Sequence, residues 1–234
     1  MSDGFVTSIS SLDWAALGWF LVAWAGYGWF SEHSRWSRDG LLGMSHRFRL
    51  EWGRQMLRRE MRMTDAALVG NLMQSVSFYA STTIYIVAGL LAVLGALDQV
   101  IRFAEDLPFA RETSRALWEL KLLLLLTVFV VAYFKFTWSL RQFNLLSILI
   151  GATPAGVDGD ATEVAAHRLA TVNSLAGDEF NRGIRAYYFG LAAVAWFIQP
   201  WLFLGVTTIV VVVLYRRDFA SPALAALRDE TPRG

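Results

Sequence analysis

Lys135 is the residue whose type and position most suggest chemistry, because it lies inside a long apolar segment. An ionisable side chain at membrane depth marks a candidate functional site. No aspartate or glutamate occurs in three stretches of the chain, at residues 66–97, 120–157 and 180–217. We therefore expect Lys135 to bind carbonyls, hydroxyls, an aromatic face, a loop carboxylate or an anionic ligand. A structural contact, or extension of the side chain to the cytoplasmic interface near Arg141, is favoured over a transport role.

A second set of basic and polar residues is predicted to meet at the cytoplasmic ends of the third and fourth apolar segments. Guanidinium groups bind phosphate through a forked pair of donors, so this set is a candidate site for an anion or a lipid phosphate. The alternative is a structural network in which Arg141 pairs with Asp178 or Glu179, and it is favoured for most of the set. Together with Lys135, the candidate ligand-binding residues are Arg141, Asn144, Asn181, Arg182, Arg185 and Tyr188.

The segments that must position these residues are four apolar stretches, at about residues 12–31, 66–97, 117–140 and 187–215. The chain has 234 residues, of which 55% are hydrophobic, and a mean hydropathy of +0.40. A helix that crosses a bilayer needs about 20 mostly apolar residues. We therefore expect an all-α integral membrane bundle with four transmembrane helices. It forms a single domain over residues 1–234.

The distribution of arginine predicts the orientation. Eight arginines lie between residues 32 and 65, and basic residues near membrane spans favour the cytoplasm. Segments 32–65 and 141–186 are then cytoplasmic, and both termini lie outside. Arg216 and Arg217 argue more weakly for the opposite placement of the C-terminal end. The first residues carry no basic side chain, which does not fit a cleavable signal peptide.

Residues 40–63 have the pattern of an amphipathic helix on the cytoplasmic surface. Met44, Phe48 and Trp52 recur at helical spacing, and arginines lie on the other faces. Such a helix can lie at headgroup level and bind anionic lipid. An equally supported alternative is a topology signal packed on a cytoplasmic extension of the bundle. Nucleic-acid binding is not expected. The candidate lipid-surface residues are Arg47, Arg54, Arg58 and Arg62.

The second segment is polar on one side, and polar groups in hydrocarbon need protein or water as partners. Ala88, Ala92 and Ala96, further along, predict a packing face. The polar residues are Asn71, Gln74, Ser75, Ser77, Ser81, Thr82 and Tyr85.

The third segment continues in helical character to Ile150, a length of roughly 50 Å at 1.5 Å per residue. A bilayer core is about 30 Å thick, so the end of this helix is predicted to extend into the cytoplasm.

The final part of the chain is predicted to form a short helix to residue 175, a break at Gly177 and then one long helix. Pro200, preceded by Gln199, lies near the middle of that helix, where proline removes a hydrogen bond and favours a kink. Broken helices in transporters often line a binding site or gate. Gln199 and Pro200 are therefore the candidate gate or hinge.

Several classes of chemistry lack the residues that they need. The chain has no cysteine, its three histidines lie outside the four segments, and the segments contain no pair of carboxylates. It has no Walker loop, no HExxH motif and no serine-nucleophile motif. We expect no metal, no cofactor and no enzymatic activity, although modification of lipids is not excluded.

Two stretches of the chain carry a family resemblance: KFTWSLRQFNLLSILIGATP (residues 135–154) and NSLAGDEFNRGIRAYYFGLAAVAWFIQP (residues 173–200). They resemble a bacterial and plant membrane family that is catalogued as domain of unknown function family 599. The similarity covers most of the chain, from about residue 12 to residue 219. The resemblance implies a multi-span helical protein, in a bacterium one of the inner membrane. It supplies no activity and no site residues.

Two functions follow as hypotheses. The first is a non-enzymatic scaffold or assembly factor with an anionic-lipid-binding cytoplasmic surface. The alternative is an oligomeric channel or transporter for ions or small solutes, lined by the polar side of the second segment and Lys135. The expected partners are anionic membrane lipids, and further copies of the chain or another membrane protein. An enzyme acting on lipids is the least supported reading.

Overall fold

The computed structural model describes residues 9–105, 114–154 and 159–228, and all regular structure in these ranges is helical. This confirms the predicted all-α fold. The elements are α2 (Ser11–His33), η1 (Arg35–Arg38), α3 (Leu41–Leu57), α4 (Met63–Gly95), α5 (Leu97–Glu105), α6 (Arg115–Ala152), α7 (Asp160–Val194), η2 (Ala195–Phe197), α8 (Pro200–Phe219) and α9 (Pro222–Arg228).

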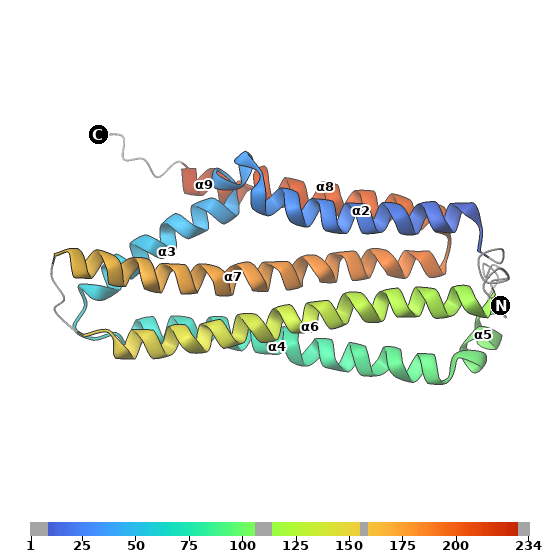
Figure 1. Cartoon of the computed structure of the whole chain (residues 1–234), viewed down its shortest axis with the longest axis horizontal. Coiled ribbons are helices and arrows are strands. Elements are labelled where there is room, and N and C mark those ends of the chain that lie inside the picture. Colours follow the sequence, from blue (N-terminus) through green and yellow to red (C-terminus); the bar gives the residue numbers. More distant parts are fainter. Residues whose placement is uncertain (1–8, 106–113, 155–158, 229–234) are drawn as a thin grey trace.

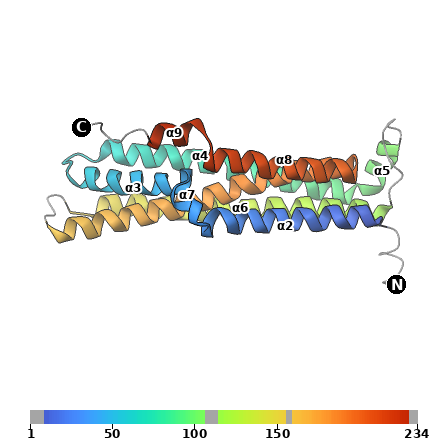
Figure 2. The same cartoon turned by 90° about the horizontal axis from the view of Figure 1, so that it is seen from above.

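Helices α6 and α7 lie side by side along the length of the molecule, as Figures 1 and 2 show. Helix α4 packs on α6, whereas α2 and α8 pack on each other and on α7. Fully buried aromatic side chains fill the space between them, among them Phe20, Phe136, Phe189, Trp196 and Phe203. Trp196 and Phe203 stack with their ring centroids 5.1 Å apart. The aromatic core therefore joins α2, α6, α7 and α8.

Helix α6 confirms the predicted continuation of the third segment past Arg141. It has 38 residues, which corresponds to about 57 Å. Its far end is held by Arg62, whose Nη1 donates to the carbonyl oxygens of Ile150 and Thr153 at 3.2 and 2.5 Å, and whose Nη2 donates to that of Pro154 at 2.9 Å. Because the last carbonyls of a helix lack intrahelical partners, these bonds satisfy them.

Helix α3 packs along the first half of α7. A Cβ atom at Gly53 would lie 3.0 Å from the carbonyl oxygen of Ala166, so the two backbones are in close contact. Asp65, at the start of α4, is fully buried and accepts hydrogen bonds from Trp52 Nε1 at 2.9 Å and Arg59 Nη1 at 2.6 Å. These contacts support the interpretation of residues 40–63 as a helix packed on a bundle extension.

The predicted single helix over residues 187–215 is wrong. Helix α7 runs unbroken through Gly177 to Val194, and after η2 the chain reverses at Gln199, whose backbone is extended. Pro200 is the first residue of α8, where its missing N–H has no helical partner to lose. The proline therefore starts a helix instead of bending one. Gln199 and Pro200 form the turn of an antiparallel hairpin, not a hinge in mid-helix (Figure 1).

This reversal also changes where the ends of the chain lie. Helix α2 begins at one end of the molecule, whereas α9 lies beside α3 (Figure 1), where Arg228 Nη2 donates to the carbonyl oxygen of Asp39 at 2.5 Å. The C-terminal helix thus lies beside the arginine-rich segment, at a different level from Ser11. The expectation that both termini lie outside depended on a single fourth span, and the hairpin removes that basis.

Two helices of the described residues, α4 and α6, are long and apolar enough to cross a membrane. Only 17% of the apolar window of α4 is buried within the molecule, against 44% for α6. This criterion does not select α2 or α8. The four predicted spans are therefore not all recovered by length and composition.

Candidate functional site

Five charged side chains meet where α2 ends beside α6 and α7. We call them the Glu32 cluster: Glu32, Lys135, Glu179, Arg182 and Arg185. Arg182 donates from Nε and Nη2 to both carboxylate oxygens of Glu32, at 2.8 and 2.7 Å. Arg185 Nη2 donates to Glu32 Oε1 at 2.6 Å. This forked arrangement ties the last turn of α2 to the middle of α7.

Lys135 joins the cluster through Glu179. Lys135 Nζ lies 3.1 Å from Glu179 Oε2, and Arg182 also donates to Glu179. Lys135 therefore has the carboxylate partner that the three acid-free stretches could not supply, from a residue just before the third of them. The predicted pairing of Arg141 with Asp178 or Glu179 is wrong, because Glu179 binds Lys135 and Arg182 and Asp178 lies beside His46 and Arg49.

The arginines of the cluster favour the charged form of Glu32. Burial alone raises the pKa of Glu32, but the hydrogen bonds and charges of Arg182 and Arg185 outweigh it, so that the pKa lies below its ordinary value. The hydrogen bond to Glu32 in turn raises the pKa of Arg182. Three cations face two carboxylates, which leaves the cluster with one excess positive charge.

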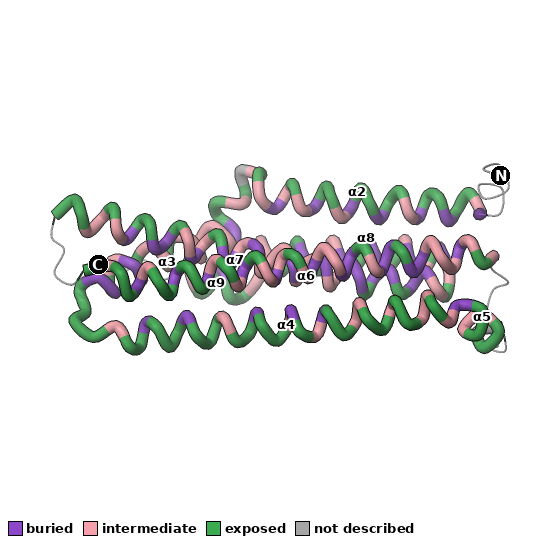
Figure 3. The backbone as a smooth tube through the Cα atoms, turned by 60° about the horizontal axis from the view of Figure 1, so that its bottom comes forward, coloured by how far each residue is buried: buried purple, intermediate pink, exposed green. Residues whose placement is uncertain are grey.

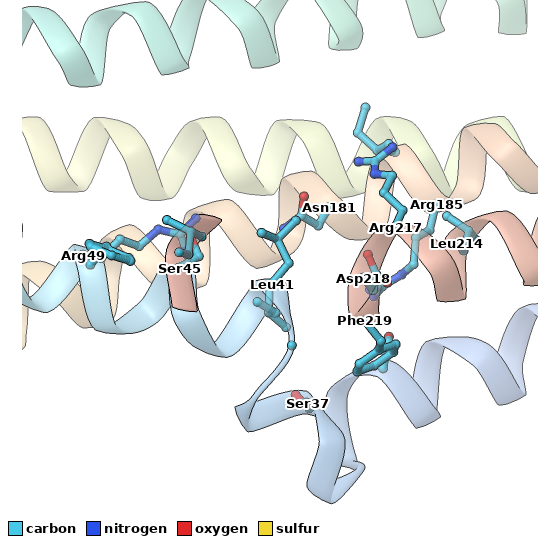
Figure 4. Close-up of a pocket in the computed structure, with 16 residues that line it drawn as sticks. Ser37, Leu41, Ser45, Arg49, Asn181, Arg185, Leu214, Arg217, Asp218 and Phe219 are labelled. Atoms are coloured by element: carbon cyan, nitrogen blue, oxygen red, sulfur yellow. The ribbon is translucent and has the colours of Figure 1, made fainter. Parts of the chain in front are cut away.

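A cavity of about 450 Å³ lies next to the cluster, between α3, α7 and the end of α8 (Figure 4). One group of its lining residues is basic: Arg49, Arg185 and Arg217. Another is apolar: Leu41, Phe48, Leu214, Phe219 and Leu227. The lining also contains one acidic residue, Asp218. Figure 4 places Arg49 at one end and Arg185 and Arg217 at the other. A cavity with this combination suits a molecule that has both an anionic and an apolar part.

The guanidinium of Arg49 is mostly buried, and its nearest carboxylate is distant. Its Nη1 atom is buried without a hydrogen bond and lies 3.9 Å from Asp178 Oδ1, which is too long for one. Asp178 instead lies 3.0 Å from His46 Nε2. Burial lowers the pKa of Arg49, and the charge of Asp178 opposes this only in part. Gly177 makes room for the guanidinium, because a Cβ atom there would lie 2.1 Å from Arg49 Nη2.

Arg217, in the last turn of α8, also lacks a hydrogen-bonded carboxylate among the described residues. Its Nη1 donates to the hydroxyl of Tyr188 at 2.8 Å, and its guanidinium carbon lies 5.6 Å from the centre of that ring. The neighbouring Asp218 accepts a hydrogen bond from the hydroxyl of Tyr27 at 2.6 Å. Arg49 and Arg217 are thus the two cavity arginines whose charge is least neutralised.

The structure brings together most, but not all, of the predicted ligand-binding residues. Asn181 and Arg185 line the cavity, Tyr188 binds Arg217, and Lys135 and Arg182 belong to the Glu32 cluster. Arg141 and Asn144 are exposed on α6, outside the cavity lining, with Arg141 over the ring of Trp138. Sequence reasoning missed Glu32, Arg49 and Arg217, since their roles depend on a hairpin and a helix packing that one-dimensional spacing does not reveal.

The four arginines predicted to form a lipid surface divide into two pairs. Arg54 donates to both oxygens of Glu163, at 3.0 and 2.5 Å, and Arg62 caps α6. These two bind other parts of the bundle. Arg47 and Arg58 are exposed, and only this pair remains on an open surface.

The opposite end of the molecule has a small polar cluster of its own. Asp13 is buried and accepts hydrogen bonds from Trp196 Nε1 at 2.8 Å and from Ser10 Oγ at 2.5 Å. The buried Lys121 lies over the same tryptophan, with Nζ 5.8 Å from the ring centre. The turn between α7 and α8, which contains Gln199 and Pro200, lies at this end, whereas the cavity is lined by residues from the other end of α8 (Figure 1).

The polar side of α4 faces outward. Asn71, Gln74, Ser81 and Tyr85 are exposed, whereas Val69, Val76, Ala80 and Thr83 are buried against the bundle. The sequence predicted that this side faces protein or water, and within one copy of the chain it does not face protein.

Comparison with known proteins identifies a family but no activity. The family model described as "Protein of unknown function, DUF599" matches residues 15–223. No curated protein and no solved structure matches the chain significantly. No group of three or more side chains that could hold a metal occurs among the residues that the structure describes.

Proposed function

We propose that this chain, which belongs to the DUF599 family of proteins of unknown function, is a non-enzymatic membrane scaffold that holds an anionic phospholipid in the cavity between α3, α7 and α8. One observation carries the proposal: Arg49 and Arg217, from different helices, face one partly apolar cavity without a hydrogen-bonded carboxylate. Arginine binds phosphate through paired donors, and the apolar wall suits the start of an acyl chain.

The position of the cavity fits a headgroup. Exposed tryptophans tend to lie at the two interfaces of a membrane protein. Trp14 and Trp29 are exposed on α2 and separated by about 22 Å of helix, and the half-buried Trp118 on α6 lies about 30 Å of helix from the exposed Trp138. The spacing on α6 matches a bilayer core of about 30 Å, and the spacing on α2 is shorter. The cavity lies beside Ser31, just past Trp29, and hence at the level of one interface.

In this arrangement the membrane contains α2 as far as Trp29, α8 as far as Leu214, the first half of α6 and the adjoining parts of α4 and α7. Helix α3 and the far ends of α6 and α7 extend on the arginine-rich side, which the positive-inside rule assigns to the cytoplasm. Arg216 and Arg217 then lie on the same side as the other arginines, which removes the conflict that a single fourth span produced. In a bacterium this membrane is the inner one.

Native mass spectrometry of protein from nanodiscs tests the proposal. The nanodiscs contain a neutral phospholipid with a minor share of an anionic one. We expect the wild type and the Arg58→Gln control, which changes an exposed arginine, to retain the anionic lipid. Arg217→Gln and Arg49→Gln are expected to lose it. Retention of the same lipid by a folded Arg217→Gln protein contradicts the proposal.

A channel remains the second candidate because of one observation, the outward polar side of α4. Several copies could line a pore with that side. Lys135 is not needed for such a pore, since it has Glu179 as a partner. Flux of ions or small solutes through purified protein in liposomes, reduced by Gln74→Leu, supports this alternative against the scaffold.

A further inference from the structure

Asp178, on α7, has two basic neighbours on α3 that approach the same carboxylate oxygen. His46 Nε2 lies 3.0 Å from Asp178 Oδ1, which is hydrogen-bonding distance, whereas Arg49 Nη1 lies 3.9 Å from the same atom. Within the described part of the chain, Arg49 Nη1 is buried and has no hydrogen-bond partner. Asp178 Oδ1 must move by about 1 Å to become that partner. His46 and Arg49 are therefore alternative partners of one carboxylate oxygen.

His46 and Arg49 face different cavities. His46 and Asp178 line a polar cavity of about 350 Å³ between the end of α2, η1, α3 and α7, and Arg49 is not part of its lining. Arg49 lines the cavity between α3, α7 and α8, and neither His46 nor Asp178 does. The side chain of His46 is 40% exposed, and residues 41–50 of α3 include none that is fully buried (Figure 3). His46 can therefore exchange its proton with water, and Asp178 connects it to Arg49.

We propose that Asp178 competes with the phosphate of the bound lipid for Arg49, and that protonation of His46 removes this competition. This switch rests on the lipid site proposed above. An imidazolium attracts a carboxylate more strongly than a neutral imidazole does, because it adds a charge to the hydrogen bond. Once a protonated His46 holds Asp178, Arg49 is left to the lipid. The charge of the imidazolium also makes the neighbouring cavity more positive, so both effects tighten lipid binding as the pH falls.

The other charged groups of the polar cavity leave histidine as the residue type that changes charge near neutral pH. Histidine ordinarily titrates between about pH 5 and pH 8. Although burial opposes it, Arg182 and Arg185 hold the pKa of Glu32 below its ordinary value, so that this carboxylate keeps its charge over that range. His33 is a second histidine in the lining, and its ring stacks on Trp29. The charged or titratable residues that line this cavity with His46 and Asp178 are Glu32, His33, Arg38, Arg182 and Arg185.

Occupancy by an anionic lipid at two pH values tests the switch. The probe is phosphatidylglycerol, as a minor component of nanodiscs of neutral phospholipid, because its phosphodiester stays charged at both values. Native mass spectrometry compares the bound lipid at about pH 8 and about pH 5.5, near the two ends of the range in which histidine titrates. The variants are His46→Gln and Asp178→Asn. The control is His167→Gln, which changes an exposed histidine beside Glu163.

We expect the wild type and His167→Gln to hold several-fold more phosphatidylglycerol at the lower pH. His46→Gln should hold the smaller amount at both values, because its amide does not take up a proton. Asp178→Asn should hold the larger amount already at the higher pH, because a neutral amide does not compete with phosphate for Arg49.

Three results overturn the switch and leave lipid binding in the cavity intact. They are equal occupancy of the wild type at both pH values, a pH dependence that persists in His46→Gln, and a pH dependence that is unchanged in Asp178→Asn. The second result would assign the effect to another group such as His33, and the third would exclude competition by Asp178. Absence of bound phosphatidylglycerol from the wild type at both pH values contradicts the proposed lipid site itself, and the switch with it.

Discussion

Arg182 binds both carboxylate oxygens of Glu32 through Nε and Nη2, and so fixes the last turn of α2 against α7. The two residues are 150 positions apart. The contact joins the first helix of the bundle to one of the last. It lies at the boundary between the part of the molecule that contains α2 and α8 and the part that contains α3. Disruption of this pair is therefore expected to affect the whole bundle.

Glu32→Gln is expected to lower the free energy of unfolding by about 1–3 kcal/mol, because it removes the carboxylate that Arg185 binds and one of the two carboxylates that Arg182 binds. The measurement is denaturant unfolding in detergent, followed by circular dichroism. Asp39→Asn is the control, since Asp39 is largely exposed and only 3.8 Å from Arg47. Equal stability of Glu32→Gln and Asp39→Asn would show that the cluster adds nothing.

The same residue predicts a dependence of stability on pH. The pKa of Glu32 is lower in the folded protein than its ordinary value of 4.5. Its contribution is therefore complete above about pH 4.5 and is lost as the pH falls through the lower, folded-state pKa. Thermal unfolding between pH 6 and pH 3 should show a smaller loss of stability for Glu32→Gln than for the wild type. Parallel curves for the two proteins contradict the prediction.

Arg62→Gln removes the side chain that donates to three carbonyls, one in the last turn of α6 and two just beyond it. We expect a loss of about 1–2 kcal/mol and faster amide exchange in the last turn of the helix. Hydrogen–deuterium exchange with peptide resolution measures the second effect. Arg58→Gln, on the exposed side of the same segment, should leave both quantities unchanged. Unaltered exchange in α6 of Arg62→Gln refutes the capping role.

Gly183 is required by close packing, not by backbone conformation. A Cβ atom there would lie 2.4 Å from Phe136 Cε1, and Phe136 is fully buried. Gly183→Ala should therefore destabilise the protein by about 1–3 kcal/mol. Gly26→Ala is the matched control, because nothing lies within 4 Å of its added methyl group, and it should be neutral or slightly stabilising. Thermal unfolding measures the stability of the two variants. A Gly183→Ala protein that is more stable than Gly26→Ala contradicts the packing of α6 on α7.

The proposed membrane arrangement places the start of α2 and the end of α9 on opposite sides. In the cysteine-free chain, Ser11→Cys and Ala226→Cys put single thiols at exposed positions near these ends. A thiol reagent that cannot cross membranes should label Ser11→Cys in intact cells, and label Ala226→Cys only after the membrane is opened. Labelling of both thiols from the same side would mean that the chain crosses the membrane an even number of times, which contradicts the proposed arrangement.

Local patterns predicted the helices well and their connections less well. The apolar run after residue 117 correctly predicted one helix continuing past Arg141, because nothing in it interrupts helical bonding. The predicted break at Gly177 and the predicted kink at Pro200 are both wrong, because each of these residue types has two structural uses. Glycine permits a break, but here it makes room for Arg49. Proline kinks a helix interior, but here it begins a helix after a reversal.

The candidate site was predictable in its chemistry but not in its pairing. Arg182, Arg185, Lys135 and Asn181 could be grouped because helical spacing places them near one level. The partner of Lys135 could not be assigned, since Glu179 lies outside every predicted span and reaches it only through the packing of α6 on α7. Arg217 entered the site only because the hairpin returns α8 along α7.

The unbroken length of α6 has a mechanical consequence. Its 38 residues contain no proline, and its only glycine is Gly151, next to the last residue. A helix without a break transmits tilt as a stiff lever, so a tilt of roughly 10° about its centre displaces each end of a helix about 57 Å long by about 5 Å. Any event that tilts α6 at its Arg115 end therefore displaces Arg62 and Thr153 at the other end, without a change in fold.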